Sequence, residues 1–372
     1  MATSIWEHFC TLPDPRVERT KLHKLQDILT ITLCAVICGA ETWVDVADFG
    51  KAKQAWLRTF LELPNGIPSH DTFGRVFAAL DPQAFERCFQ AWIADLAGCS
   101  EGKLIAIDGK TIRRSIDRAS GKAAIHLVSA WVHENHVVFG QLRTEDKSNE
   151  ITAIPKLLEM LDLKATTVTI DAIGCQKDIA QQILDGGGQY VLAVKANQGT
   201  LHEDVRMFMD DAIERDFCDI QHDFYRQREK GHGRIETRRC WTTGQIEWLR
   251  GRHDWPGLQS IAVVNCRRQT GQQVSVGRRY FISSLPARTA QRIGRAVRNH
   301  WCVENELHWS LDVCFGEDHS RVRIGNAAEN LSRVRRLALT LLKQEETAKV
   351  GVKAKRLMAG WNEKYLLRVL RI

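Results

Sequence analysis

The sequence lacks the patterns expected of a membrane protein, a disulfide framework or a zinc site. Its most apolar stretch, residues 28–40, is shorter than the roughly 20 residues that a membrane-spanning helix needs. The 11 cysteines are odd in number and scattered, no CxxC pair occurs, and no signal peptide precedes them. We therefore expect a cytoplasmic protein with reduced, mostly buried thiols and no contact with a membrane.

Two short motifs resemble known sites but are incomplete. The segment Asp-Gly-Lys-Thr at residues 108–111 lacks the glycine that a nucleotide-binding P-loop needs five positions before Gly109; Leu104 stands there. His202 and Glu203 lack a second histidine four residues after the first. These absences exclude a P-loop and a zinc-protease helix at these positions.

The composition is that of an ordinary globular protein. The 372 residues allow two or three domains, and 44% of them are hydrophobic and 26% charged. The net charge of +7 permits a polyanionic partner but does not require one.

Two apolar runs each end on an aspartate. Residues 104–107 lead into Asp108 and Gly109, and the β-branched residues 166–170 lead into Asp171, after which a helical pattern follows. We interpret both runs as buried strands that end near these aspartates. Taken alone, Asp108 and Gly109 also suit a simple turn at a strand exit. Two aspartates at the edge of one sheet, however, are the oxygen ligands that a divalent-metal site for phosphoryl transfer needs.

Several longer motifs extend this pattern along the chain. They are AIDGKTIRRS, TIDAIGCQKDIA, YVLAVKANQ, REKGHGRIETR and the block that begins HWCVENELHWSLDVCFGEDHSRVR. Together they resemble the DDE transposases of bacterial insertion sequences, in the H-repeat-associated branch. The resemblance implies an α/β fold: an RNase H-like mixed five-stranded sheet with flanking helices, a β-rich insertion and an N-terminal helical domain. It also implies Mg²⁺, with Mn²⁺ as a substitute, double-stranded DNA as partner, and a homodimer or higher homo-oligomer on DNA.

The resemblance supplies the third carboxylate. Glu304 follows Trp301 in a W-x-V-E arrangement that is similar to the family's catalytic glutamate, so Asp108, Asp171 and Glu304 become the expected catalytic and metal-binding residues. Without the family, Glu306 would be an equal choice. Related transposases often carry an Arg four residues before this Glu and a Lys seven after it. Here His300 and Leu311 stand at those positions, so we transfer no role to them.

Basic and amide side chains suggest where DNA would bind. The candidates lie after the strand at residues 190–196, in the insertion and in a basic C-terminal helix: Lys195, Asn197, Gln198, His232, Arg234, Arg335 and Arg336. Simple loop chemistry is an equal alternative for the three residues after the strand, a solvated strand face is the alternative for the two in the insertion, and the sequence does not decide the role of the two in the C-terminal helix.

We expect four segments. They are an N-terminal helical domain (residues 1–100), the first part of the catalytic core (101–218), a β-rich insertion (219–286), and C-terminal helices that carry the glutamate (287–372). The preferred function is a transposase that nicks DNA and transfers strands at element ends. The alternatives are a metal-dependent nuclease, or an inactive relative that binds DNA or a protein partner.

Overall fold

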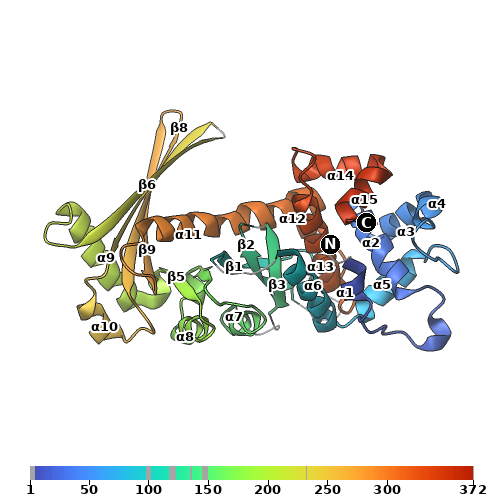
Figure 1. The fold of residues 1–372 in the computed structure, drawn as a ribbon, viewed down its shortest axis with the longest axis horizontal. Coiled ribbons are helices and arrows are strands. Elements are labelled where there is room, and N and C mark those ends of the chain that lie inside the picture. The colour runs from blue at the N-terminus through green and yellow to red at the C-terminus, as the bar shows by residue number, and fades with distance from the viewer. Residues whose placement is uncertain are drawn as a thin grey trace.

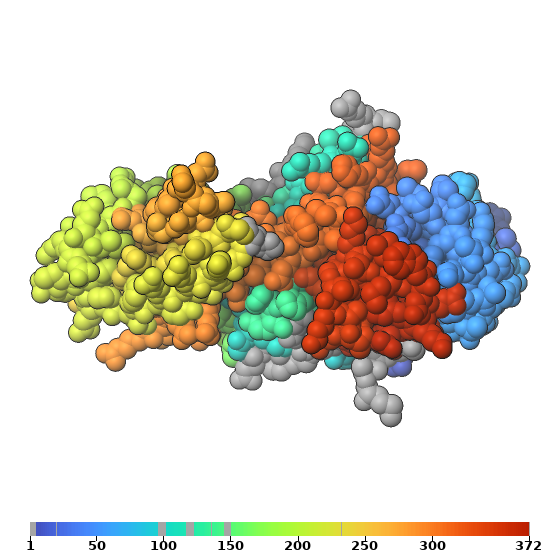
Figure 2. All heavy atoms as spheres, turned by 90° about the horizontal axis from the view of Figure 1, so that it is seen from above, coloured from blue at the N-terminus to red at the C-terminus, as the bar shows by residue number. Residues whose placement is uncertain are grey.

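A single mixed sheet runs through the molecule. The computed structural model describes residues 5–97, 102–116, 123–134, 136–144, 150–231 and 233–371. Within these ranges the sheet has nine strands in the order β3-β2-β1-β4-β5-β9-β8-β7-β6. The molecule is elongated: the insertion lies at one end and the N- and C-terminal helices lie at the other (Figures 1 and 2).

The first five strands form the expected RNase H-like core. β1 pairs with β2 antiparallel and with β4 parallel, and β4 pairs with β5 parallel. Helices α7 and α8 follow β3 and β4 as crossovers. The bounds are β1 (Leu104–Thr111), β2 (His126–Val132), β3 (Val137–Arg143), α7 (Glu150–Leu158), β4 (Thr167–Ile170), α8 (Lys177–Asp185) and β5 (Gln189–Val194). The five-stranded core predicted from the apolar runs is confirmed.

One detail of β1 differs from the prediction. Gly109 does not end the strand, since β1 continues to Thr111 and stays paired with β2 beyond Asp108. Only the parallel pairing with β4 stops, at Ile107 opposite Ile170. Asp108 therefore lies where the pairing of β1 with β4 ends and its pairing with β2 continues.

The β-rich insertion extends the core sheet. β9 pairs antiparallel with β5, and β8, β7 and β6 follow in order. The distal parts of the two hairpins stand clear of the body (Figure 1), and most of the distal half of β9 is exposed. The elements are α9 (Gly199–Glu214), β6 (His222–Gly231), β7 (Arg234–Thr243), α10 (Glu247–His253), β8 (Ser260–Thr270) and β9 (Gln273–Ser283).

The N-terminal segment is helical, as predicted, and local sequence explains several helix starts. Ser69 accepts a hydrogen bond from the Thr72 amide at the start of α5, and Asp81 accepts one from the Gln83 amide at α6. α2 is apolar on nearly every side because it is buried. The helices are α1 (Ile5–Phe9), α2 (Leu25–Cys38), α3 (Trp43–Ala52), α4 (Gln54–Leu57), α5 (His70–Ala79) and α6 (Pro82–Ala97).

A long irregular helix crosses the sheet and leads to the C-terminal helices. α11 (Ala290–Cys302) contacts β1, β4 and β7 and continues through the π-helix η4 (Val303–His308) into α12 (Trp309–Phe315). α13 (Ala327–Gln344) packs against α2, α5 and α6, and α14 (Val352–Trp361) and α15 (Glu363–Leu370) pack beside it. Among the described residues, no single helix is long and apolar enough to cross a bilayer, although α2 and α3 together are, across a 97° bend.

Candidate active site

Asp108 and Asp171 lie side by side on the sheet because their strands are parallel neighbours. Ile107 of β1 pairs with Ile170 of β4, and each aspartate is the next residue along its strand direction. The Asp171 carboxylate accepts a hydrogen bond from the Ile173 amide, which fixes the turn that leaves β4. The strand register therefore brings both carboxylates to one edge.

Glu304 reaches the same place from the helix above the sheet. It belongs to η4, a π-helical turn inserted between α11 and α12. Such turns occur frequently at functional sites. Asp108, Asp171 and Glu304 all line one cavity of about 320 Å³. The structure thus brings together the three carboxylates that the sequence pointed to.

The cavity lining includes three carboxylates and two cations, Lys195 and Arg279. Burial first, and then the nearby carboxylates of Glu150, Asp171 and Glu304, raise the pKa of Asp108 to about 7, and no lysine or arginine among the described residues is a cause of the shift. A carboxyl group shifted this far, among other carboxylates in a cavity, is typical of a site that binds a cation or performs acid–base chemistry.

Glu150 is a fourth carboxylate, which the sequence analysis missed. It is the first residue of α7, and its side chain lies over Gly109, where an added Cβ would be 2.1 Å from Glu150 Oε1. His126 Nε2 lies 2.8 Å from the same oxygen, and His126 Nδ1 lies 2.7 Å from Thr111 Oγ1. Gly109 is therefore required for close packing beside Asp108, and Glu150 is held in place there.

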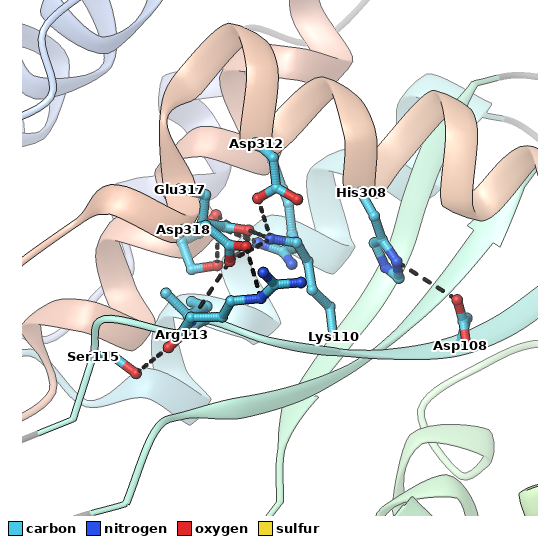
Figure 3. Close-up of polar contacts among 11 residues, drawn as sticks. Asp108, Lys110, Arg113, Ser115, His308, Asp312, Glu317 and Asp318 are labelled. Carbon is cyan, nitrogen blue, oxygen red and sulfur yellow. Dashed lines mark hydrogen bonds and ion pairs between the residues drawn. The ribbon is translucent and has the colours of Figure 1, made fainter.

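Two histidines close the site on the helix side. His308 Nδ1 lies 3.5 Å from Asp108 Oδ2 (Figure 3). His300 Nδ1 lies 3.1 Å from Thr169 Oγ1. Burial lowers the pKa of His308 to about 3 and that of His300 to about 4, so both imidazoles are neutral at pH 7. Neutral histidines do not compensate the carboxylates.

Two cations lie at the cavity rim. Lys195 follows β5, which is parallel to β4, and its side chain lines the cavity together with Arg279 of β9. The Arg279 guanidinium stacks over the Trp301 ring, 4.2 Å from its centroid. Because β4 and β5 are parallel, Lys195 lies at the same edge of the sheet as Asp171.

Asn197 and Gln198 are engaged within the protein. The Asn197 amide donates to the Ala172 carbonyl, and Gln198 Nε2 donates to the Cys175 carbonyl at 2.7 Å. Both bonds hold the turn that follows Asp171. These amides thus support a carboxylate of the site.

The basic residues expected on the outside of the C-terminal helix lie inside the molecule. Arg335 and Arg336 are 2% and 0% exposed, and Arg336 pairs with Glu317 at 3.0 Å. The interpretation of a basic, DNA-facing outer surface at these two residues is wrong, because α13 is enclosed by the N-terminal helices. Arg234, on the insertion, is partly exposed and pairs with Glu236. His232 lies outside the described residues.

Three acidic residues after Glu304, considered as reserve carboxylates, have partners of their own. Asp312, Glu317 and Asp318 surround Lys110, whose Nζ lies 2.5, 3.3 and 3.4 Å from their oxygens (Figure 3). Burial acts to raise the pKa of Glu317, but Arg336 and Lys110 outweigh it and lower that pKa to about 2. This cluster is charge-balanced and separate from the cavity.

The donor set of the cavity fits a hard divalent cation. Carboxylate oxygens are what Mg²⁺ and Mn²⁺ bind, and an RNase H-like sheet gathers three of them here beside two basic side chains. Family comparison agrees. A model described as "Transposase DDE domain" matches residues 100–341, and one described as "DDE_Tnp_1-associated" matches residues 6–93. The chain belongs to the DDE transposase family.

Curated relatives place it in the H-repeat-associated branch. "Putative transposase YncI" of Escherichia coli O157:H7 is 44% identical over 99% of this chain and 94% of its own length. "H repeat-associated putative transposase YhhI" of E. coli K12 is 41% identical over 98% of this chain and 97% of its own length. A short relative, "Inactive transposase YbfQ" of E. coli K12, is 47% identical over 19% of this chain.

Proposed function

We propose that the protein is a DNA transposase that nicks and transfers strands at insertion-sequence ends with Mg²⁺. The observation that carries the proposal is the convergence of Asp108, Asp171 and Glu304 on one cavity, where burial and the neighbouring carboxylates raise the pKa of Asp108 to about 7. These three residues would hold the metal, with Mn²⁺ as a substitute. Bound divalent ions supply activation of the attacking hydroxyl and stabilisation of the leaving oxygen.

The protein's own groups position the DNA. Lys195 and Arg279 stand at the rim, where a phosphate that approaches the carboxylates would meet positive charge. Asn197 and Gln198 act indirectly, because they hold the turn after Asp171. Arg234, on the projecting hairpin, is a candidate for a phosphate contact farther along the DNA. Joining two element ends calls for at least two copies of the chain on DNA.

The first test locates Mn²⁺ by anomalous scattering in crystals of wild type, Asp108→Asn and the control Asp312→Asn. We expect Mn²⁺ among Asp108, Asp171 and Glu304, lost in Asp108→Asn and kept in Asp312→Asn. The control removes a carboxylate from the balanced cluster, which does not line the cavity.

The second test uses a supercoiled plasmid that carries the sequences flanking the gene. Mg²⁺-dependent nicking at the element ends, followed by strand transfer, is the expected result. Cleavage without regard to sequence would indicate a nuclease. DNA binding without cleavage would overturn the proposal in favour of an inactive relative, whether or not the protein binds Mn²⁺.

A further inference from the structure

A second group of metal-ligating side chains lies outside the cavity. His133 and His136 lie in the turn between β2 and β3, and Glu306 belongs to η4, two residues beyond Glu304. One ring nitrogen from each histidine and one carboxylate oxygen of Glu306 all lie within 4.8 Å of one another. None of these three residues lines the cavity of the catalytic carboxylates.

The spacing of the atoms suits a small ion. Each histidine faces a different oxygen of Glu306: His136 Nδ1 lies 2.8 Å from Oε2 and His133 Nδ1 lies 3.7 Å from Oε1. Ligands held about 2.0–2.2 Å from a tetrahedral zinc lie roughly 3.4 Å apart, within this range. His133 Nδ1 is buried and has no hydrogen-bond partner among the described residues. A bound cation would satisfy that nitrogen.

The turn brings the two imidazoles together before any ion binds. The His136 amide donates to the His133 carbonyl at 3.3 Å, and the ring centroids are 5.7 Å apart. His136 has φ of +52°, a left-handed conformation that residues other than glycine adopt infrequently. The backbone is thus shaped so that both rings face Glu306.

Lys343 is the natural competitor for the same carboxylate. Its Nζ lies 3.5 Å from Glu306 Oε2 and 4.9 Å from the centroid of the Trp131 ring. Any cation that enters must therefore share Glu306 with Lys343 or replace it.

We propose that His133, His136 and Glu306 form a second metal site, for a transition-metal ion such as Zn²⁺. Imidazole nitrogen favours Zn²⁺, Ni²⁺ or Cu²⁺ over Mg²⁺, so this site differs in chemistry from the three carboxylates of the cavity. The ion would join the β2–β3 turn to η4, the turn that carries Glu304. Water completes the coordination, since the protein supplies three side chains.

The test uses the full chain with both Asp108→Asn and Asp171→Asn. These two substitutions weaken metal binding by the catalytic carboxylates, and this double variant is the parent of the variants that follow. Zn²⁺ binding is measured by calorimetry, and Co²⁺ serves as a spectroscopic probe of coordination. We expect one site with imidazole ligation. His136→Ala or Glu306→Gln weakens binding by more than about tenfold, because loss of even an outer-shell partner costs 10–100-fold. Lys343→Met tightens it by removing the competing charge.

His253→Ala is the matched control. His253 also lies beside a carboxylate, with Nε2 2.6 Å from Asp204 Oδ2, but no second histidine completes a cluster there among the described residues. Its Zn²⁺ affinity should equal that of the parent. Equal Zn²⁺ stoichiometry and affinity in the parent, His136→Ala and Glu306→Gln, with circular dichroism showing all three folded, would overturn the proposal. So would the absence of Zn²⁺ binding in the parent and in wild type.

Discussion

Two groups of carboxylates lie beside strand β1, one around Asp108 and one around Lys110, and they differ in how their charge is balanced. Asp108 and Lys110 are two residues apart and therefore point to the same face of the strand, toward the helices above it (Figure 3). Around Asp108 stand Asp171 and Glu304 with two neutral histidines, and Glu150, which lies over Gly109 on the opposite face of the strand, also acts on the charge of Asp108. Around Lys110 stand Asp312, Glu317 and Asp318, with Arg336 behind them.

The difference separates a structural cluster from a functional one. Glu317 is 0% exposed and still ionised, because two cations contact it. Burial and the carboxylates of Glu150, Asp171 and Glu304 raise the pKa of Asp108 to about 7, and no lysine or arginine among the described residues is a cause of that shift. A protein tolerates buried charge when it is paired, and a group left unpaired marks a place where a ligand completes the balance. Changes on each side of this comparison should therefore have opposite effects on stability.

Arg336→Met should give the largest effect. Among the described residues it leaves Lys110 as the cation in ion-pair contact with the fully buried Glu317, and breaking such a pair costs about 3–5 kcal/mol of unfolding free energy. Urea denaturation of the full chain measures this loss. Arg113→Ala is the control, because Arg113 pairs with Asp318 at the surface with 81% of its side chain exposed. Its loss should stay below about 1 kcal/mol. Equal stability of the two variants would contradict the structural role of this cluster.

Asp108→Asn should act in the opposite direction. The folded pKa of Asp108, about 7, lies above its ordinary value of 3.8, so the folded state binds the proton more tightly. Its contribution favours folding at low pH and is lost as pH rises from about 4 to about 7. Asparagine does not ionise. Without divalent metal, the variant should exceed wild type by about 1–3 kcal/mol at pH 8.

The pH dependence is the control for this prediction. The stability difference between Asp108→Asn and wild type should shrink toward zero at pH 4, where wild-type Asp108 is protonated in the folded state. Saturating Mg²⁺ should stabilise wild type through binding and leave the variant unchanged. A difference that is constant between pH 4 and pH 8 would show that the asparagine acts through packing, not charge.

The order of strands and the two aspartates could be predicted from the sequence because the signals are local. Apolar runs define β1 and β4, and each run leads directly into its aspartate. The identity of Glu304 came from family resemblance, since helix periodicity does not distinguish it from Glu306. The structure separates the two: Glu304 lines the cavity, while Glu306 contacts His136 and Lys343.

Other features depend on contacts between distant segments. Glu150 lies over Gly109, and no pattern near either residue announces that contact. Arg335 and Arg336 flank an apolar stripe and looked solvent-facing, but Glu317 and the N-terminal helices enclose them. The β-rich insertion was expected as a segment of its own at residues 219–286, yet β9 pairs with β5 and extends the core sheet. Pairing across such long sequence separations is not encoded in local periodicity.

Glu150→Gln should give the smallest effect and sharpen the comparison further. Its carboxylate is one of the charges that raise the pKa of Asp108, and a glutamine side chain keeps its size and can still bond His126. Removing the charge should lower the pKa of Asp108 and stabilise the metal-free protein at pH 8 by less than about 1 kcal/mol.

A double-mutant cycle distinguishes charge from packing in this case. If Glu150 acts on Asp108 through charge, the gain from Glu150→Gln should vanish once Asp108 is already asparagine, since the ionised partner is then gone. Urea denaturation of wild type, both single variants and the double variant at pH 8 and pH 4 measures that coupling. Additive effects at both pH values would mean that Glu150 acts only through its contacts with His126 and Gly109. Coupling at pH 8 that disappears at pH 4 would place Glu150 in the same unbalanced cluster as Asp108.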